Sequence, residues 1–180
     1  PQLTELDINN QSPVNTIGHN IWLDPHVCAL VDNLPPNILK LNLSFQNYLR
    51  DKHVETLVSR CKKITELDLR STKITNDSLT SIIKHLNSLE KLDISYTKID
   101  FFMLLQLKSI PTLKILHCHF IEENTKKIKN LKLQLPHISI IEKYQNLNIA
   151  DPNLWENRTK PQDIFPSTLI LGPPGSPDGP

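Results

Sequence analysis

One apolar spacing recurs along most of the chain and constrains its fold more than any other feature. The frame is Leu-x-x-Leu-x-Leu, in which Ile or Cys can replace Leu. Its first residues are 35, 26, 25, 24 and 22 positions apart. A nearly constant spacing predicts that one structural unit is repeated. The six occurrences are Leu3-Leu6-Ile8, Ile38-Leu41-Leu43, Ile64-Leu67-Leu69, Leu89-Leu92-Ile94, Leu113-Leu116-Cys118 and Leu135-Ile138-Ile140.

Between the frames, apolar residues recur every three or four positions, which predicts helices. A unit of one strand and one helix, about 20–29 residues long, is typical of a leucine-rich repeat. Neither element can cover its apolar face alone, so the units must stack. The sequence therefore predicts an α/β leucine-rich-repeat solenoid of about six repeats, with a curved parallel sheet and convex helices. The helices are expected near Pro25–Leu34, Arg50–Cys61, after a cap at Thr75, and near Asn124–Leu135.

The repeat stops near Ile141, where the composition changes. Seven of the fourteen prolines and three of the four glycines follow this residue. Proline cannot continue a strand ladder or a helix. We therefore expect a leucine-rich-repeat domain at residues 1–141, a C-terminal tail at 142–171 and a disordered Pro/Gly-rich end at 172–180. Because the tail retains apolar residues such as Trp155, we expect it to dock on another surface.

Composition argues against several functional classes. With four glycines and no Gly-Lys pair, the chain cannot form a phosphate-binding loop or a dinucleotide-binding turn. The 20 Lys and Arg nearly balance the 19 Asp and Glu, so nucleic acid is not the expected partner. No apolar run approaches the roughly 18 residues that a membrane helix needs.

The three cysteines and the first residue bear on the cellular context. The three cysteines, Cys28, Cys61 and Cys118, are odd in number and lie far apart in the sequence. We therefore expect reduced thiols in an intracellular protein. The chain starts at Pro1 rather than Met, so we expect it to be a fragment of a longer protein.

Alternation along a strand predicts which side chains face the concave side of the sheet. They should be those at the third, fifth and seventh positions of each frame. A mixed polar surface of this kind suits a protein or peptide partner, and a merely solvated face is the alternative. The predicted surface includes Asp68, Arg70, Asp93, His117 and His119.

Two clusters on this face invite a chemical interpretation. Asp68 and Asp93 resemble a general acid and base, but salt links to Arg70 and Lys91 are the simpler expectation. His117 and His119, with His137 on the next strand, could bind a metal ion, or could be ordinary exposed histidines. Cys118 should point into the core. The sequence therefore predicts a protein that is not an enzyme and that needs no cofactor or metal.

Several short stretches together resemble the F-box proteins with leucine-rich repeats, over roughly residues 1–170. The repeats alone would be generic, but Ile-Pro-Thr-Leu-Lys followed by Leu-Pro-His and then by the two tail motifs is more specific. The stretches are Asn42-Leu43-Ser44, Leu57–Cys61, Leu67-Asp68-Leu69, Ile110–Lys114, Leu135–Ile138, Ile149–Pro152 and Gln162–Phe165.

The resemblance implies a substrate receptor of a Skp1-cullin-F-box ubiquitin ligase, in the nucleus and cytoplasm, whose F-box is absent from this chain. In this family the tail folds back along the concave face. The late repeats and tail hold a cyclin-dependent-kinase-subunit accessory protein, and both capture a phosphorylated kinase inhibitor of the Kip class. A general leucine-rich-repeat adaptor, or another F-box receptor with different partners, is the alternative. The implied partner-binding residues are Arg70, Ser71, Asp93, Tyr96, His119, Asn157, Gln162, Asp163 and Phe165.

Overall fold

The computed structural model describes residues 3–8, 29–31, 33–121 and 125–142. Six strands of three residues each alternate with helical segments in the described part of the chain. The strands are β1 (Glu5–Asp7), β2 (Lys40–Asn42), β3 (Glu66–Asp68), β4 (Lys91–Asp93), β5 (Ile115–His117) and β6 (Ser139–Ile141). The helical segments are α2 (Asp51–Arg60), α3 (Asn76–His85), the 3-10 segment η1 (Phe101–Ser109) and α4 (Thr125–Gln134).

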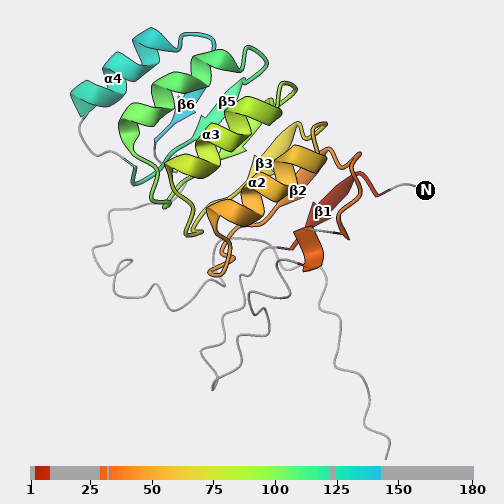
Figure 1. Ribbon diagram of the computed structural model, residues 1–180. Helices are drawn as coiled ribbons and strands as arrows, with labels where there is room; N and C mark the ends of the chain where they lie inside the picture. The colour runs from red at the N-terminus through yellow and green to blue at the C-terminus, as the bar shows by residue number, and fades with distance from the viewer. Residues whose placement is uncertain (1–2, 9–28, 32, 122–124, 143–180) are drawn as a thin grey trace, which may run out of the picture.

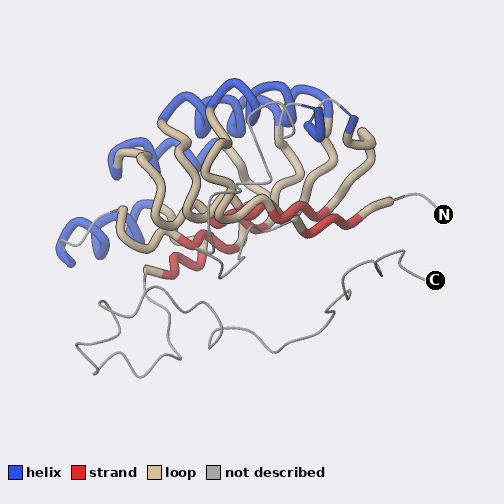
Figure 2. Tube along the Cα trace, turned by 90° about the horizontal axis from the view of Figure 1, so that it is seen from below, coloured by secondary structure: helices blue, strands red, loops and turns tan. Residues whose placement is uncertain are grey.

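The strands form one open parallel sheet in which spatial order follows chain order, from β1 to β6. Figure 1 shows the helices side by side on one face of this sheet. Figure 2, turned by 90°, shows strands and helices as two layers joined by loops. The α/β class, the parallel sheet and the helical layer are thus confirmed. We call the opposite side of the sheet, which no described helix covers, the helix-free face.

The centre of each strand carries an aliphatic residue, which is buried in β2 to β6 and partly buried in β1. These residues pair in register from Leu6 to Ile140, each one directly beside the next. Leu41, Leu67 and Leu92 are at most 3 % exposed. Because alternation sends the flanking side chains to the other face, these central residues make one continuous ladder between sheet and helices.

The sixth frame begins later than the sequence indicated. In earlier repeats the first frame residue donates its N–H to the carbonyl three residues before it, as Leu113 does to Ile110 at 3.1 Å. Ile138 makes the same bond to Leu135 at 3.0 Å, so Leu135 corresponds to Ile110 and ends the helical segment. The strand of this repeat is centred on Ile140, which pairs with Leu116, and not on Ile138 as the frame Leu135-Ile138-Ile140 indicated. The prediction was wrong because Leu135 and Ile138 are three positions apart, as are the first two apolar residues of every frame.

The helix predictions hold wherever residues are described. α2 and α3 cover the predicted spans, and the Thr75 hydroxyl accepts a hydrogen bond from Asp77 N at the start of α3. α4 lies inside the predicted span and buries Ile128 and Leu131. Residues 29–31 and 33 are helical, whereas Leu34, the last residue of the segment predicted at 25–34, lies in a bend. Residues 25–28 and 32 of that segment lie outside the described residues. The structure describes no helix that is long and apolar enough to cross a membrane.

The segment η1 departs from the expected α-helix of a repeat. It is a 3-10 helix in which Leu104 and Leu107 are buried, followed by buried Ile110. Apolar residues at every third position match the three-residue turn of a 3-10 helix and would spiral around an α-helix. The repeat between β4 and β5 is also short, since Leu89 and Leu113 are 24 residues apart.

A carboxylate connects the starts of two neighbouring helices. Asp51, the first residue of α2, accepts hydrogen bonds from the backbone N–H and hydroxyl of Thr75 and from those of Ser78. Burial by itself would raise the pKa of Asp51, but the four hydrogen bonds outweigh it and hold the pKa below its usual value. The ionised carboxylate therefore supports the N-terminus of α3.

Leu67→Ala is predicted to lower the free energy of unfolding by about 2–5 kcal/mol, because it leaves a cavity in the central ladder. The exposed Lys62→Ala variant should change it by less than about 0.5 kcal/mol. Urea titration followed by circular dichroism measures both. Equal losses in the two variants would show that the ladder is not the core.

Asp51→Ala is predicted to lower the free energy of unfolding at neutral pH by about 1–3 kcal/mol, because buried donors of Thr75 and Ser78 lose their acceptor. Since the folded pKa of Asp51 is lowered, its contribution should be present above the unfolded pKa and be lost as pH falls through the folded value. Urea titrations of wild type and variant across acidic pH test this. Glu55→Ala, in the same helix but exposed, is the control; a loss as large there would contradict the assignment.

Candidate functional site

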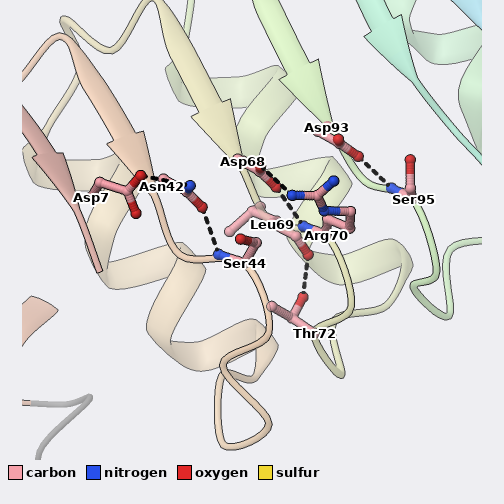
Figure 3. A network of polar contacts seen from close by, with 9 residues as sticks. All are labelled: Asp7, Asn42, Ser44, Asp68, Leu69, Arg70, Thr72, Asp93 and Ser95. Atoms are coloured by element: carbon pink, nitrogen blue, oxygen red, sulfur yellow. Dashed lines mark hydrogen bonds and ion pairs between the residues drawn. The ribbon is translucent and has the colours of Figure 1, made fainter. Parts of the chain in front are cut away.

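The C-terminal ends of β2, β3 and β4 share one turn geometry. At each of these ends the fifth-position side chain of the frame accepts a hydrogen bond from the backbone N–H two residues later (Figure 3). This is an Asx turn, which redirects the chain without leaving a donor unpaired. The bonds are Ser44 N to Asn42 Oδ1 at 3.0 Å, Arg70 N to Asp68 Oδ1 at 2.9 Å and Ser95 N to Asp93 Oδ1 at 2.9 Å. After β5, His119 N instead bonds to Ser95 Oγ at 3.1 Å.

The seventh frame positions are buried, contrary to the prediction of an open polar row. The prediction extended strand alternation beyond the fifth position. Each strand ends at that position, however, and the turn that follows bends the chain away, so period-two geometry no longer applies. Their exposed fractions are 0 % for Ser44, 8 % for Arg70, 0 % for Ser95 and 2 % for His119.

The eighth positions all adopt the left-handed backbone conformation. Their φ angles are 62° at Phe45, 56° at Ser71, 59° at Tyr96 and 58° at Phe120. This conformation costs a residue with a Cβ atom about 1–2 kcal/mol, and it is unusual for bulky side chains. Three aromatic residues nevertheless occupy the four positions. Their rings must therefore make contacts that offset the backbone cost.

Those contacts place aromatic and cationic groups side by side. The rings of Tyr96 and Phe120 stack with centroids 4.6 Å apart, and the rings of Tyr96 and His119 are parallel at 6.5 Å. The Arg70 guanidinium carbon lies 5.2 Å from the centre of the Phe45 ring, a cation–π geometry. Phe120 keeps 47 % of its surface exposed despite its stacking. We call residues 42–45, 68–71, 93–96 and 117–120 the strand-end edge.

Acidic and imidazole groups of the strand-end edge lie in a partly buried environment. Burial raises the pKa of Asp68 to about 6, and the neighbouring Asp93 carboxylate adds to this, while Arg70 at 3.6 Å acts in the opposite direction. The predicted salt link of Asp68 to Arg70 is confirmed. Burial also lowers the pKa of His117 and of His119, which favours their neutral forms.

The metal alternative finds no support in the described residues. His137 is exposed and precedes β6, so it does not join His117 and His119 on a neighbouring strand. Among the described residues, no three His, Cys, Asp or Glu side chains are placed to hold a metal ion. Cys118 points into the core as predicted, and burial raises the pKa of its thiol to about 12, which keeps it protonated.

The third frame positions form a separate row on the helix-free face. Lys40 lies between two carboxylates, 3.2 Å from Glu5 and 3.4 Å from Glu66. The hydrogen bond and charge of Glu5, and then those of Glu66, raise the pKa of Lys40. From β1 to β3 the charged side chains of this row therefore pair with one another. The strand-end edge is the better candidate for a binding site.

The strand-end edge unites every predicted site residue that the structure describes. Two members were missed, Phe45 and Phe120. Both share the eighth frame position with the predicted Ser71 and Tyr96, so reading that column of the repeat would have found them. The united residues are Asp68, Arg70, Ser71, Asp93, Tyr96, His117 and His119. The other four predicted residues, Asn157, Gln162, Asp163 and Phe165, lie outside the described residues.

The architecture defines a class, an open α/β fold with a six-stranded parallel sheet, and its structural neighbours have folds of the leucine-rich-repeat type. Consistent with this, the chain is similar to the solved structure of leiomodin-1 actin-binding site 2, with a TM-score of 0.50 and 22 % sequence identity. The match covers 74 % of this chain and 79 % of that one, and it bears on the fold alone. A TLR13–ssRNA13 complex matches with a TM-score of 0.38 and 19 % identity, over 66 % of this chain and 19 % of that one. No protein-family model matches the sequence.

Asp68→Asn is predicted to stabilise the protein above pH 6. The pKa of Asp68 is about 6 in the folded protein and 3.8 in the unfolded chain. The free energy of unfolding of the wild type therefore falls as pH rises from 3.8 to about 6. Asparagine can keep the Asx turn, as Asn42 does, but carries no buried charge. The gain at pH 7.5 should reach up to about 3 kcal/mol.

Urea titration at pH 4.5 and pH 7.5 measures this effect. The difference between Asp68→Asn and wild type should be much smaller at the lower pH. Asp77→Asn, an exposed carboxylate in α3, is the control and should show no such growth with pH. A constant difference for Asp68→Asn at both pH values would rule out the raised pKa.

Proposed function

We propose that this chain is the substrate-recognition part of a Skp1-cullin-F-box ubiquitin ligase, a leucine-rich-repeat solenoid of about six repeats plus a tail. The family it resembles is that of F-box proteins with leucine-rich repeats, and the most similar member is the S-phase kinase-associated substrate receptor. Its task would be to capture phosphorylated cell-cycle regulators for ubiquitination. It would bind rather than catalyse, and would join the ligase core through an F-box that this chain does not contain.

One observation carries the proposal. Residues that the resemblance implies to be partner-binding, such as Arg70, Tyr96 and His119, come from three different repeats and lie together on the strand-end edge. Partner-binding surfaces commonly combine aromatic anchors with arginine, and this edge has both. The aromatic rings are also held in a costly backbone conformation, which supports a role beyond packing.

The proposed complex divides the work between two proteins. The cyclin-dependent-kinase-subunit accessory protein would bind the strand-end edge together with the tail, residues 142–171, folded back along the helix-free face. Phosphate would be bound largely by that accessory protein, while the edge would supply apolar and charged contacts. The setting would be the nucleus and the cytoplasm, without a cofactor, nucleic acid or membrane.

The alternative is a leucine-rich-repeat adaptor, or another F-box receptor, with different partners. It is favoured by the fold that the chain shares with leiomodin-1, whose solved region is described as an actin-binding site. A fold of this kind can thus present different binding surfaces, and the partner is decided by side chains.

The test is a binding titration of the full chain against a phosphorylated Kip-class inhibitor peptide, with and without the accessory protein. We expect binding in the presence of the accessory protein. Tyr96→Asn should weaken it about tenfold or more, because asparagine accepts the left-handed backbone but removes the ring.

Phe102→Ala, which removes an exposed ring from the helical face, is the matched control and should leave this binding unchanged. Absence of binding both with and without the accessory protein would exclude the proposed function. Binding that Tyr96→Asn and Phe102→Ala leave equally strong would place the site elsewhere on the chain.

A further inference from the structure

The first half of η1 is apolar although it lies on the surface. Figure 1 shows η1 between α3 and α4 in the helical layer, and it contacts both. Its first five residues, 101–105, are all apolar, yet only Leu104 of these is buried. Phe102 is 70 % exposed, and Met103 remains partly exposed. A group of exposed apolar side chains often marks an interaction site.

Exposed apolar side chains in the helical layer are confined to this region. α2 and α3 present no exposed large apolar residue in the structure. Within the described helices, such residues occur only at Phe102 in η1 and at Leu133 in α4, which is 79 % exposed. The other repeats thus have ordinary polar outer surfaces, and the last two do not.

The same region concentrates positive charge. α2 balances Asp51 and Glu55 against Lys52 and Arg60, and α3 balances Asp77 against Lys84. Together, η1 and α4 contain five lysines and no acidic residue. The lysines are Lys108, Lys126, Lys127, Lys129 and Lys132.

Two contacts show how these charges are arranged. The Lys127 ammonium lies 5.4 Å from the centre of the Phe102 ring, so charge and aromatic surface adjoin. Lys132 pairs with Glu142 at 2.6 Å, which shows that a carboxylate can reach this helix. Lys129 and Leu133 are four residues apart, and therefore neighbours on the exposed side of α4.

We propose that η1 and α4 form a second docking surface, for an acidic segment of a partner protein that carries an apolar anchor residue. We call it the basic apolar patch. Carboxylates of the partner would pair with the lysines of α4, and the anchor would cover Phe102. This surface lies in the helical layer, so it could be occupied while the strand-end edge binds another partner.

The charge of the basic apolar patch favours an acidic protein segment over a second copy of the chain or a nucleic acid. Two copies meeting through this patch would bring lysines against lysines, which opposes a symmetric dimer. Nucleic acid would gain little from exposed Phe and Leu side chains, and the chain as a whole has a charge of only +1. An acidic, apolar-centred segment is complementary to both features of the patch.

The test uses the full chain and a fluorescent helix-forming peptide of about 14 residues, made of Glu, Ala and Leu with one central Trp. Fluorescence anisotropy should show saturable binding that weakens as salt is raised. The Phe102→Ala/Leu133→Ala double variant and Lys129→Glu should each lose about tenfold in affinity. Both changes are at exposed positions, and a thermal melt checks that the variants remain folded.

The controls separate this patch from the strand-end edge. Phe120→Asn removes an exposed ring from that edge, and Lys52→Glu reverses a charge on α2; both should leave peptide binding unchanged. The proposal is overturned if a Gln-for-Glu peptide binds equally well, or if the patch variants bind like wild type. It is also overturned if the chain binds anionic vesicles but not the peptide, or if sedimentation shows a dimer that Phe102→Ala abolishes.

Discussion

The structure depends on the in-register pairing of six very short parallel strands. A strand of three residues makes few hydrogen bonds and is not stable by itself. Each is held because its central aliphatic residue lies between the same residues of its neighbours and beneath a helix. The strands, the helices and their connecting turns therefore form together, and no single repeat could bury its own apolar face.

This arrangement also explains why the candidate site lies where it does. Because the strands are parallel and in register, equivalent turns lie next to one another along one edge of the sheet. An Asx turn recurs there in three consecutive repeats and a left-handed residue in four. Residues that are about 25 positions apart in sequence thus become neighbours, as Tyr96 and Phe120 do at 4.6 Å. A binding surface can be varied at these positions without altering the central ladder.

The fold and the candidate site were predictable to different degrees. Spacing alone located the strands and the capped start of α3, because apolar periodicity reflects which face is buried. It misplaced the sixth frame, since Leu135 belongs to the end of a helical segment although it has frame spacing. It also placed Arg70 and His119 on an open surface, because alternation holds only within a strand, and the strands end two residues earlier.

The sequence by itself determined the repeat, the α/β class and the residues that form the central ladder in the first five strands. These follow from local periodicity and from the general need to bury aliphatic surface. Only the tertiary structure decided the register of the last repeat, the burial of the seventh positions, and the stacking of rings along the strand-end edge. Those features depend on where each turn bends the chain and on which side chains neighbouring repeats bring together, and spacing along a single chain does not contain that information.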